Sequence, residues 1–120
     1  MEAVNRLNNL LSSYDECSLS SFDGCRLVII GDFDLTYHHA FEAEFVEVSY
    51  INCPTYFYAQ VFRLATSDER KKLEFELANY INLEDYIFCI ESDERHFFIA
   101  AESLIIREGS IPHHQADNFK

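Results

Sequence analysis

The spacing of apolar residues changes its period along this 120-residue chain, and the order of those periods constrains the fold most strongly. Near the N-terminus, apolar side chains recur every three or four residues, while Asn and Ser lie on the opposite side. The apolar positions are Val4, Leu7, Leu10, Leu11 and Tyr14. This spacing predicts a surface helix with one buried face. Residues 15–24 are rich in Ser, Asp and Gly and predict a loop.

Apolar residues at alternate positions, the period of a β-strand, follow in three consecutive segments. These segments are residues 26–35, 41–51 and 56–65, separated by short polar connections. Short connections favour antiparallel neighbours, so we expect a three-stranded meander. Within the first segment, Gly31 predicts a bulge or the point where the strand leaves the covered part of the sheet.

The second half of the chain predicts a helix followed by two strands. Thr66 and Glu69 have the spacing of a capping box at a helix start. The expected buried stripe of that helix is Leu73, Leu77, Tyr80 and Ile81. Residues 86–91 are almost continuously apolar, which favours a central strand covered on both faces. A hairpin loop at 92–95 and a long strand at 96–108 follow, and a polar tail begins at about residue 109.

The predicted order of elements is therefore α-β-β-β-α-β-β. Such a segregated order favours an α+β fold, with two helices and a five-stranded, mostly antiparallel twisted sheet. The length fits one globular domain over residues 1–120.

The segment 41–51 carries a shift in its apolar alternation. Apolar residues occupy odd positions up to Phe45 and even positions from Val46 onward. A shift by one residue is what a β-bulge produces. With the bulge at 45–46, one acidic stripe projects from the solvent face, made of Glu42, Glu44 and Glu47.

The overall charge is strongly negative. The chain has 21 acidic and 9 basic residues, a formal net charge of -12. Such a charge repels phosphate backbones and anionic lipids, which argues against nucleic-acid and membrane binding. A basic protein partner or a cation is the natural complement. Asp32 and Asp34, on one face of the segment 26–35, join the acidic stripe in the expected partner-binding surface.

The cysteines indicate a reducing compartment. The N-terminus lacks the basic and apolar regions of a signal peptide, and no apolar run is long enough to span a membrane. Cys89 lies in an apolar run, where a thiol behaves as a small buried hydrophobe. The four cysteines match no zinc-ribbon or C-x-x-C spacing. We expect a cytoplasmic protein with mostly structural thiols.

Histidines supply the only metal-site hypothesis that the sequence offers. His38 and His39 are adjacent, as are the two histidines at 113–114, while His96 stands alone. Neighbouring residues of a strand point to opposite faces, so each pair offers one ligand to a site, and no i, i+4 helical pair occurs. Exposed loop and tail histidines are therefore favoured over a metal site, and no cofactor is expected.

The sequence carries no catalytic motif. Three glycines allow neither G-x-G-x-x-G nor a P-loop, and no serine occupies a G-x-S-x-G elbow. Acidic residues two apart on a strand are typical of a solvated face, whereas glycosidase carboxylates face each other across a cleft. An enzyme is thus the less favoured class.

Tyr56 and Tyr58 are the aromatic residues most suited to an interface. They share a face at the start of a strand, and tyrosine combines a large apolar area with a polar tip. Most other aromatic side chains are expected to pack the sheet against its helices.

Three functional classes follow from these patterns. The first is an acidic protein-interaction module, an inhibitor or immunity-type protein that binds a basic partner; this comparison rests on architecture and charge alone. The second is a small-ligand or metal-binding domain that uses the concave sheet face, with His38 or His39 and tyrosines at its rim. The third is a homo-oligomeric structural protein, such as a homodimer, in which apolar strand faces pair across a two-fold axis.

Overall fold

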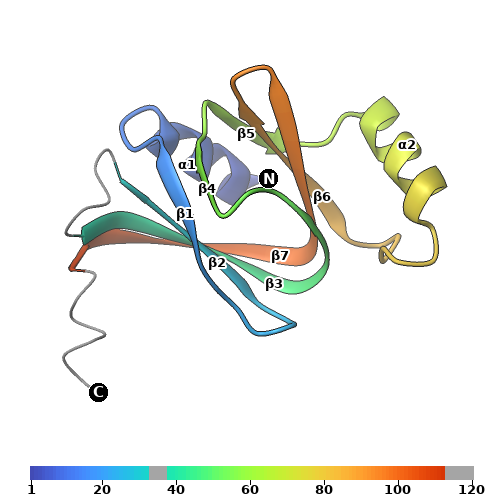
Figure 1. Ribbon diagram of the computed structural model, residues 1–120, viewed down its shortest axis with the longest axis horizontal. Coiled ribbons are helices and arrows are strands. Elements are labelled where there is room, and N and C mark those ends of the chain that lie inside the picture. The colour runs from blue at the N-terminus through green and yellow to red at the C-terminus, as the bar shows by residue number, and fades with distance from the viewer. Residues whose placement is uncertain (33–37, 113–120) are drawn as a thin grey trace.

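The computed structural model describes residues 1–32 and 38–112, which contain two helices and seven strands (Figure 1). The elements are α1 (Glu2–Leu11), β1 (Glu16–Phe22), β2 (Leu27–Asp32), β3 (His38–Asn52), β4 (Tyr56–Tyr58), β5 (Val61–Leu64), α2 (Ser67–Leu77), β6 (Tyr86–Ser92) and β7 (Arg95–Pro112). Neither helix in these two ranges is long and apolar enough to cross a membrane.

The seven strands form one antiparallel sheet in the order β4-β1-β2-β3-β7-β6-β5. The expected α+β fold with two helices and an antiparallel sheet is confirmed. The expected number of five strands is wrong, because the sheet has seven. The long strands β3 and β7, of 15 and 18 residues, pair along most of their length and form the centre of the sheet.

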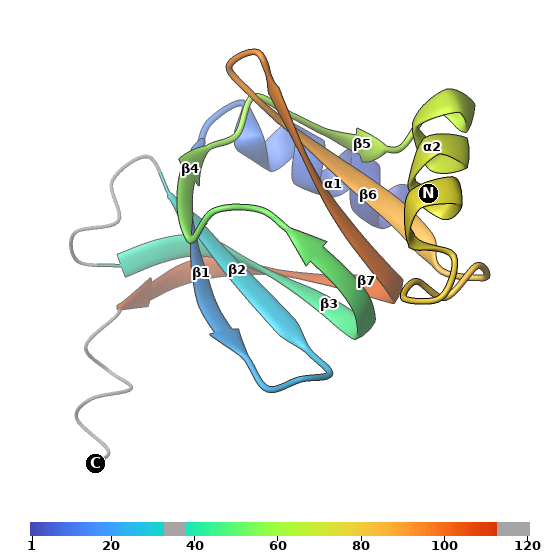
Figure 2. The same cartoon turned by 45° about the vertical axis from the view of Figure 1, so that its right-hand side comes forward.

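The sheet curves into a half-barrel. Its two edge strands, β4 and β5, are consecutive in the chain and are separated only by Ala59 and Gln60. The Gln60 N–H donates to the Glu91 carbonyl oxygen at 2.8 Å, and the Ser92 hydroxyl donates to the Tyr58 carbonyl oxygen at 2.5 Å. These bonds hold the two edges near each other at one end of the sheet (Figure 2).

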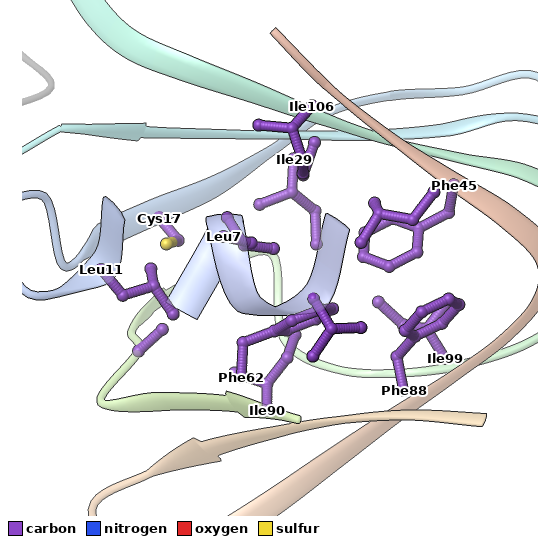
Figure 3. Packing of buried hydrophobic residues seen from close by; sticks show 14 of the residues in the cluster. Leu7, Leu11, Cys17, Ile29, Phe45, Phe62, Phe88, Ile90, Ile99 and Ile106 are labelled. Atoms are coloured by element: carbon purple, nitrogen blue, oxygen red, sulfur yellow. The ribbon is translucent and has the colours of Figure 1, made fainter. Parts of the chain in front are cut away.

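Helix α1 fills the concave side of the half-barrel. Its Val4, Leu7 and Leu11 are buried, as the helical spacing predicts. Figure 3 shows Leu7 between Ile29 of β2 and Phe62 of β5. The space left between α1 and these strands is about 10 Å³, about the least that a cavity needs to hold one water molecule. The concave face therefore leaves no room there for a small ligand.

Helix α2 covers the opposite face of the sheet near β6. Thr66 and Glu69 form the predicted capping box. Leu73 is buried against a second apolar cluster that contains Ile87. Tyr80 was expected in this buried stripe, but it lies beyond the end of the helix with 77% of its surface exposed.

Strand β6 is covered on both faces, as its apolar run predicts. Phe88 packs into the cluster beneath α1, and its neighbour Ile87 packs into the cluster beneath α2. Its sheet neighbours are β5 and β7, so it is an interior strand.

The segment 15–24 is not a loop, because it contains β1. Only Cys17 and Leu19 of this strand face the core, while the intervening positions are polar. Two apolar side chains among serines do not produce a recognisable alternation. The polar composition of β1 reflects its position near the edge of the sheet, where one face meets solvent.

The segment 56–65 is not one strand next to 41–51. It divides into β4 and β5, which lie at opposite edges, and β3 pairs with β2 and β7 instead. Gly31 marks no bulge, because its pairing with Cys17 and Phe41 is regular. A Cβ atom at Gly31 would lie 2.1 Å from the Phe41 ring, so this position needs glycine for close packing.

The shift within the segment 41–51 lies later than expected. Phe45 and Val46 pair regularly with β7, and the irregularity falls between Val48 and Tyr50. Glu47 has a positive φ of 54°, a left-handed conformation that re-aims the following side chains. At the other end of the chain, β7 continues to Pro112, past the expected start of the tail, and residues 113–120 lie outside the description.

Candidate functional site

The face of the sheet that points away from α1, called the outer face below, carries most of the sequence-predicted site residues. Cys17 and Phe57 point into the core, so the alternation of side chains sends Glu16, Tyr56 and Tyr58 outward. Tyr58 lies opposite Glu16 in the β1–β4 ladder, and β4 is the edge strand of the sheet.

Tyr56, Tyr58 and Glu16 form a compact cluster, called the tyrosine cluster below. The two rings meet edge to face, with centroids 5.7 Å apart. The Tyr56 hydroxyl donates to Glu16, the Tyr58 hydroxyl lies 3.3 Å from Glu16 Oε2, and the two hydroxyl oxygens lie 3.0 Å apart. Each tyrosine nevertheless leaves 49% of its surface exposed.

The hydrogen bonds to Glu16 and Tyr58 raise the pKa of Tyr56 well above its ordinary value of 10. A carboxylate that accepts a hydrogen bond from a phenol stabilises the neutral phenol, and its own charge opposes the formation of a phenolate beside it. The tyrosine cluster is therefore a pair of aromatic rings held beside a carboxylate at the surface, with the Tyr56 phenol kept in its neutral form.

Two residues of the expected acidic stripe are neutralised within the sheet. Glu44, which is 8% exposed, binds Arg26 and Arg107, each at 2.9 Å. Glu42 binds Arg107 at 3.2 Å and His39 at 2.9 Å. Burial by itself raises the pKa of Glu42, but the bonds from His39 and Arg107 outweigh it and lower that pKa.

The stripe is therefore not the continuous exposed surface that we expected. Arg107 lies directly opposite Glu42 in β7, and the sequence does not reveal which strand is the neighbour of β3. Asp32 shares the outer face with these two glutamates but is 1% exposed. Glu47 is exposed and accepts a hydrogen bond from the Cys25 thiol at 3.1 Å. Asp34 lies outside the described residues.

Of the two adjacent histidines, the structure describes the side chain of His39 alone. His39 is 7% exposed and bonds to Glu42. His38 is the first residue of β3, and its side chain lies outside the description.

A second cluster, called the thiol cluster below, was not predicted. Glu69, Cys89 and His96 come from α2, β6 and β7, and one ligand atom from each lies within 4.8 Å of the others. His96 Nδ1 is 3.4 Å from Glu69 Oε2. Arg63 of β5 lies opposite Cys89 and binds Glu69 at 2.7 Å.

In the thiol cluster, Cys89 is buried, while Glu69 and His96 face a groove at the surface. Burial raises the pKa of the Cys89 thiol to about 11, more than nearby Arg63 lowers it. Glu69 and His96 line a groove of about 330 Å³ between α2 and the outer ends of β3 and β7. The groove also contacts Tyr50, Asn52, Lys72, Leu73, Glu76 and Phe98.

Sequence reasoning missed the thiol cluster because its members serve separate local roles. Glu69 was recognised as a capping residue, Cys89 as a buried apolar residue and His96 as an isolated histidine. The available signal was Arg63, a charged residue in an otherwise apolar strand, which requires carboxylate partners nearby.

Comparison of the chain with models of protein families, with curated proteins and with solved structures found no match.

Proposed function

We propose that this chain is a small protein-interaction module that binds a basic protein partner through the tyrosine cluster and the adjoining outer face. The observation that carries the proposal is the half-exposed pair Tyr56 and Tyr58 fixed around Glu16 at the sheet edge. It fits the class of small acidic inhibitors, including immunity-type proteins that neutralise a cationic enzyme or toxin.

Aromatic rings held in place before binding favour tight association. Tyrosine supplies a large contact area and a polar tip, and it is enriched at the centres of interfaces. The bonds to Glu16 and the edge-to-face contact already restrict both side chains. Less side-chain entropy is therefore lost when a partner binds.

The charge of the molecule favours a basic partner. Five arginines already bind carboxylates of this chain, namely Arg6, Arg26, Arg63, Arg70 and Arg107. The net charge of -12 is what remains after these cations are counted. A field of this sign accelerates encounter with a cationic protein and repels nucleic acid and anionic membranes.

The site of action that we propose is the cytoplasm. The four cysteines are free thiols in the structure, with Cys17 and Cys89 buried. Unpaired, buried thiols fit a reducing compartment.

Site-specific photocrosslinking tests the proposal. The photoreactive residue p-benzoylphenylalanine replaces Tyr58 in one variant and Tyr80 in a matched control, since Tyr80 is also exposed but lies beyond α2. Both variants are irradiated in lysate of the source cells, at low and at moderate salt, and crosslinked proteins are identified by mass spectrometry.

We expect position 58 to crosslink a defined basic protein that position 80 does not reach, with a yield that falls as salt rises. Identical crosslinks from both positions would contradict the proposal. So would the absence of any crosslink from position 58 at low salt.

A further inference from the structure

The thiol cluster brings together three different kinds of metal-ligating side chain from three separate elements. Cys89 lies on the interior strand β6, His96 lies near the start of β7, and Glu69 lies in the first turn of α2. The three residues belong to different elements, so they come close to one another only when the sheet has formed and α2 has packed beside it. Thiolate, imidazole and carboxylate are the ligands that zinc takes in proteins.

The separations suit a single small ion after modest side-chain movement. Zinc binds sulfur at about 2.3 Å, and nitrogen and oxygen at about 2.0–2.2 Å, so ligand atoms around one ion lie roughly 3–4 Å apart. The three ligand atoms here lie within 4.8 Å of one another, and His96 Nδ1 is 3.4 Å from Glu69 Oε2. The His96 side chain is 45% exposed, so its ring can turn toward Cys89 without disturbing the core.

Two of the three ligands are positioned by the surrounding structure. The Glu69 carboxylate accepts from the Thr66 N–H at 2.8 Å in the capping box, and Arg63 donates to both of its oxygens, to Oε1 at 2.7 Å and to Oε2 at 3.0 Å. Cys89 is 0% exposed in a strand paired on both edges. Fixed ligands reduce the cost of ordering a metal site.

The positive charge of Arg63 would repel a cation at this place, but the nearby negative charges are sufficient to balance both. Arg63 binds both Glu69 and Glu91. Once a metal displaces the thiol proton to solvent, Cys89 adds a third negative charge beside these two carboxylates. Three negative charges then balance the guanidinium and a divalent ion, so the loaded cluster is neutral.

We propose that the thiol cluster is a binding site for a divalent zinc-type ion, with Cys89 Sγ, a ring nitrogen of His96 and a carboxylate oxygen of Glu69 as ligands. The fourth position faces the groove beside α2, where a water molecule or a small donor ligand enters. Three protein ligands with one open position form the arrangement of zinc sites that exchange a ligand. This site is independent of the tyrosine cluster and of partner binding.

Cobalt substitution of the untagged full-length chain tests the ligand set directly. A cobalt(II)–thiolate bond gives a charge-transfer band in the near ultraviolet that carboxylate and imidazole ligands alone do not give. Zinc is then added to displace cobalt, and its affinity is measured by calorimetry. The probes are therefore Co²⁺ and Zn²⁺ alone.

Matched variants separate the thiol cluster from other thiols and histidines. Cys89→Ala and His96→Gln change the proposed ligands, and the second of these alters a side chain that is 45% exposed. Cys25→Ser removes a thiol that bonds to Glu47 instead. A His113→Asn/His114→Asn variant removes the histidine pair near the C-terminus.

We expect the wild type and both controls to bind one ion per chain and to show the thiolate band. Cys89→Ala should abolish the band. His96→Gln should weaken zinc binding by more than about 100-fold, since loss of a group that merely supports a ligand already costs about 10–100-fold. A wild type without the band overturns the proposal and leaves the cluster an ion-pair network. A band that survives in Cys89→Ala, or zinc affinity that is unchanged in His96→Gln, also overturns it.

Discussion

Glu16 joins the two tyrosines of the proposed interface through hydrogen bonds. Its carboxylate accepts from the Tyr56 hydroxyl and lies 3.3 Å from the Tyr58 hydroxyl. An anionic acceptor holds a phenol in its neutral form, so Tyr56 presents a hydrogen-bonded but uncharged ring to solvent. Both rings remain half-exposed beside the carboxylate, so a partner can contact them together.

Replacing the Glu16 carboxylate by an amide should remove the cause of the raised pKa of Tyr56. In Glu16→Gln the pKa of Tyr56 should fall toward its ordinary value of 10, because the charge that opposes its ionisation is gone. Carbon NMR of labelled tyrosine side chains during an alkaline titration measures this shift. Asp93→Asn, which removes a different exposed carboxylate, serves as the control. An unchanged Tyr56 titration in Glu16→Gln would show that the bond to Glu16 does not form.

Gly31 and Phe41 form a second residue-level constraint, in the core. The Phe41 ring, which is 1% exposed, occupies the space that a Cβ at position 31 would need. Gly31→Ala should therefore lower the free energy of unfolding by about 1–3 kcal/mol through overpacking. Urea denaturation of both single variants and of Gly31→Ala/Phe41→Leu completes a double-mutant cycle. We expect the double variant to lose less stability than the sum of the single losses; additive losses would argue against this contact.

Among the elements, helices were the most predictable from sequence, because their signals are local. The apolar spacing of α1 and the capping box of α2 both depend on residues within two turns of each other. Strand β1 escaped prediction because it faces solvent on one side and is serine-rich. The segment 56–65 was predicted as one strand because its sequence does not show that its two parts pair with different strands, β4 with β1 and β5 with β6.

The α2 capping box should contribute measurably to stability. Thr66 accepts from the Glu69 N–H at 3.2 Å, and the Glu69 carboxylate accepts from the Thr66 N–H at 2.8 Å. Thr66→Ala should reduce the free energy of unfolding by about 1 kcal/mol. Ser67→Ala, at the first helical position, is the matched control with little expected change. Equal losses in both variants would refute a specific role for the cap.

For the whole molecule, the sequence predicted the fold class and the excess of negative charge. It did not predict which carboxylates form ion pairs within the sheet. Exposure of Glu42 and Glu44 depends on which strand lies next to β3, and that neighbour is β7, which brings Arg107. Tyr56 and Tyr58 were predicted as interface residues. Their contact with Glu16 could not be predicted, because it depends on the pairing of β4 with β1. Long-range strand pairing therefore decides which predicted residues come together and which are neutralised.

The tyrosine cluster is the proposed binding centre for a basic partner. Its most direct test is the affinity of the crosslinked partner for wild type, Tyr56→Ala/Tyr58→Ala and the control Tyr80→Ala, measured at two salt concentrations. We predict that the double variant weakens binding by at least about thirtyfold, the effect of losing a hot spot worth about 2 kcal/mol. Tyr80→Ala should bind as wild type, and higher salt should slow association of all three. A double variant that binds like wild type, or a loss of equal size in Tyr80→Ala, would contradict the account.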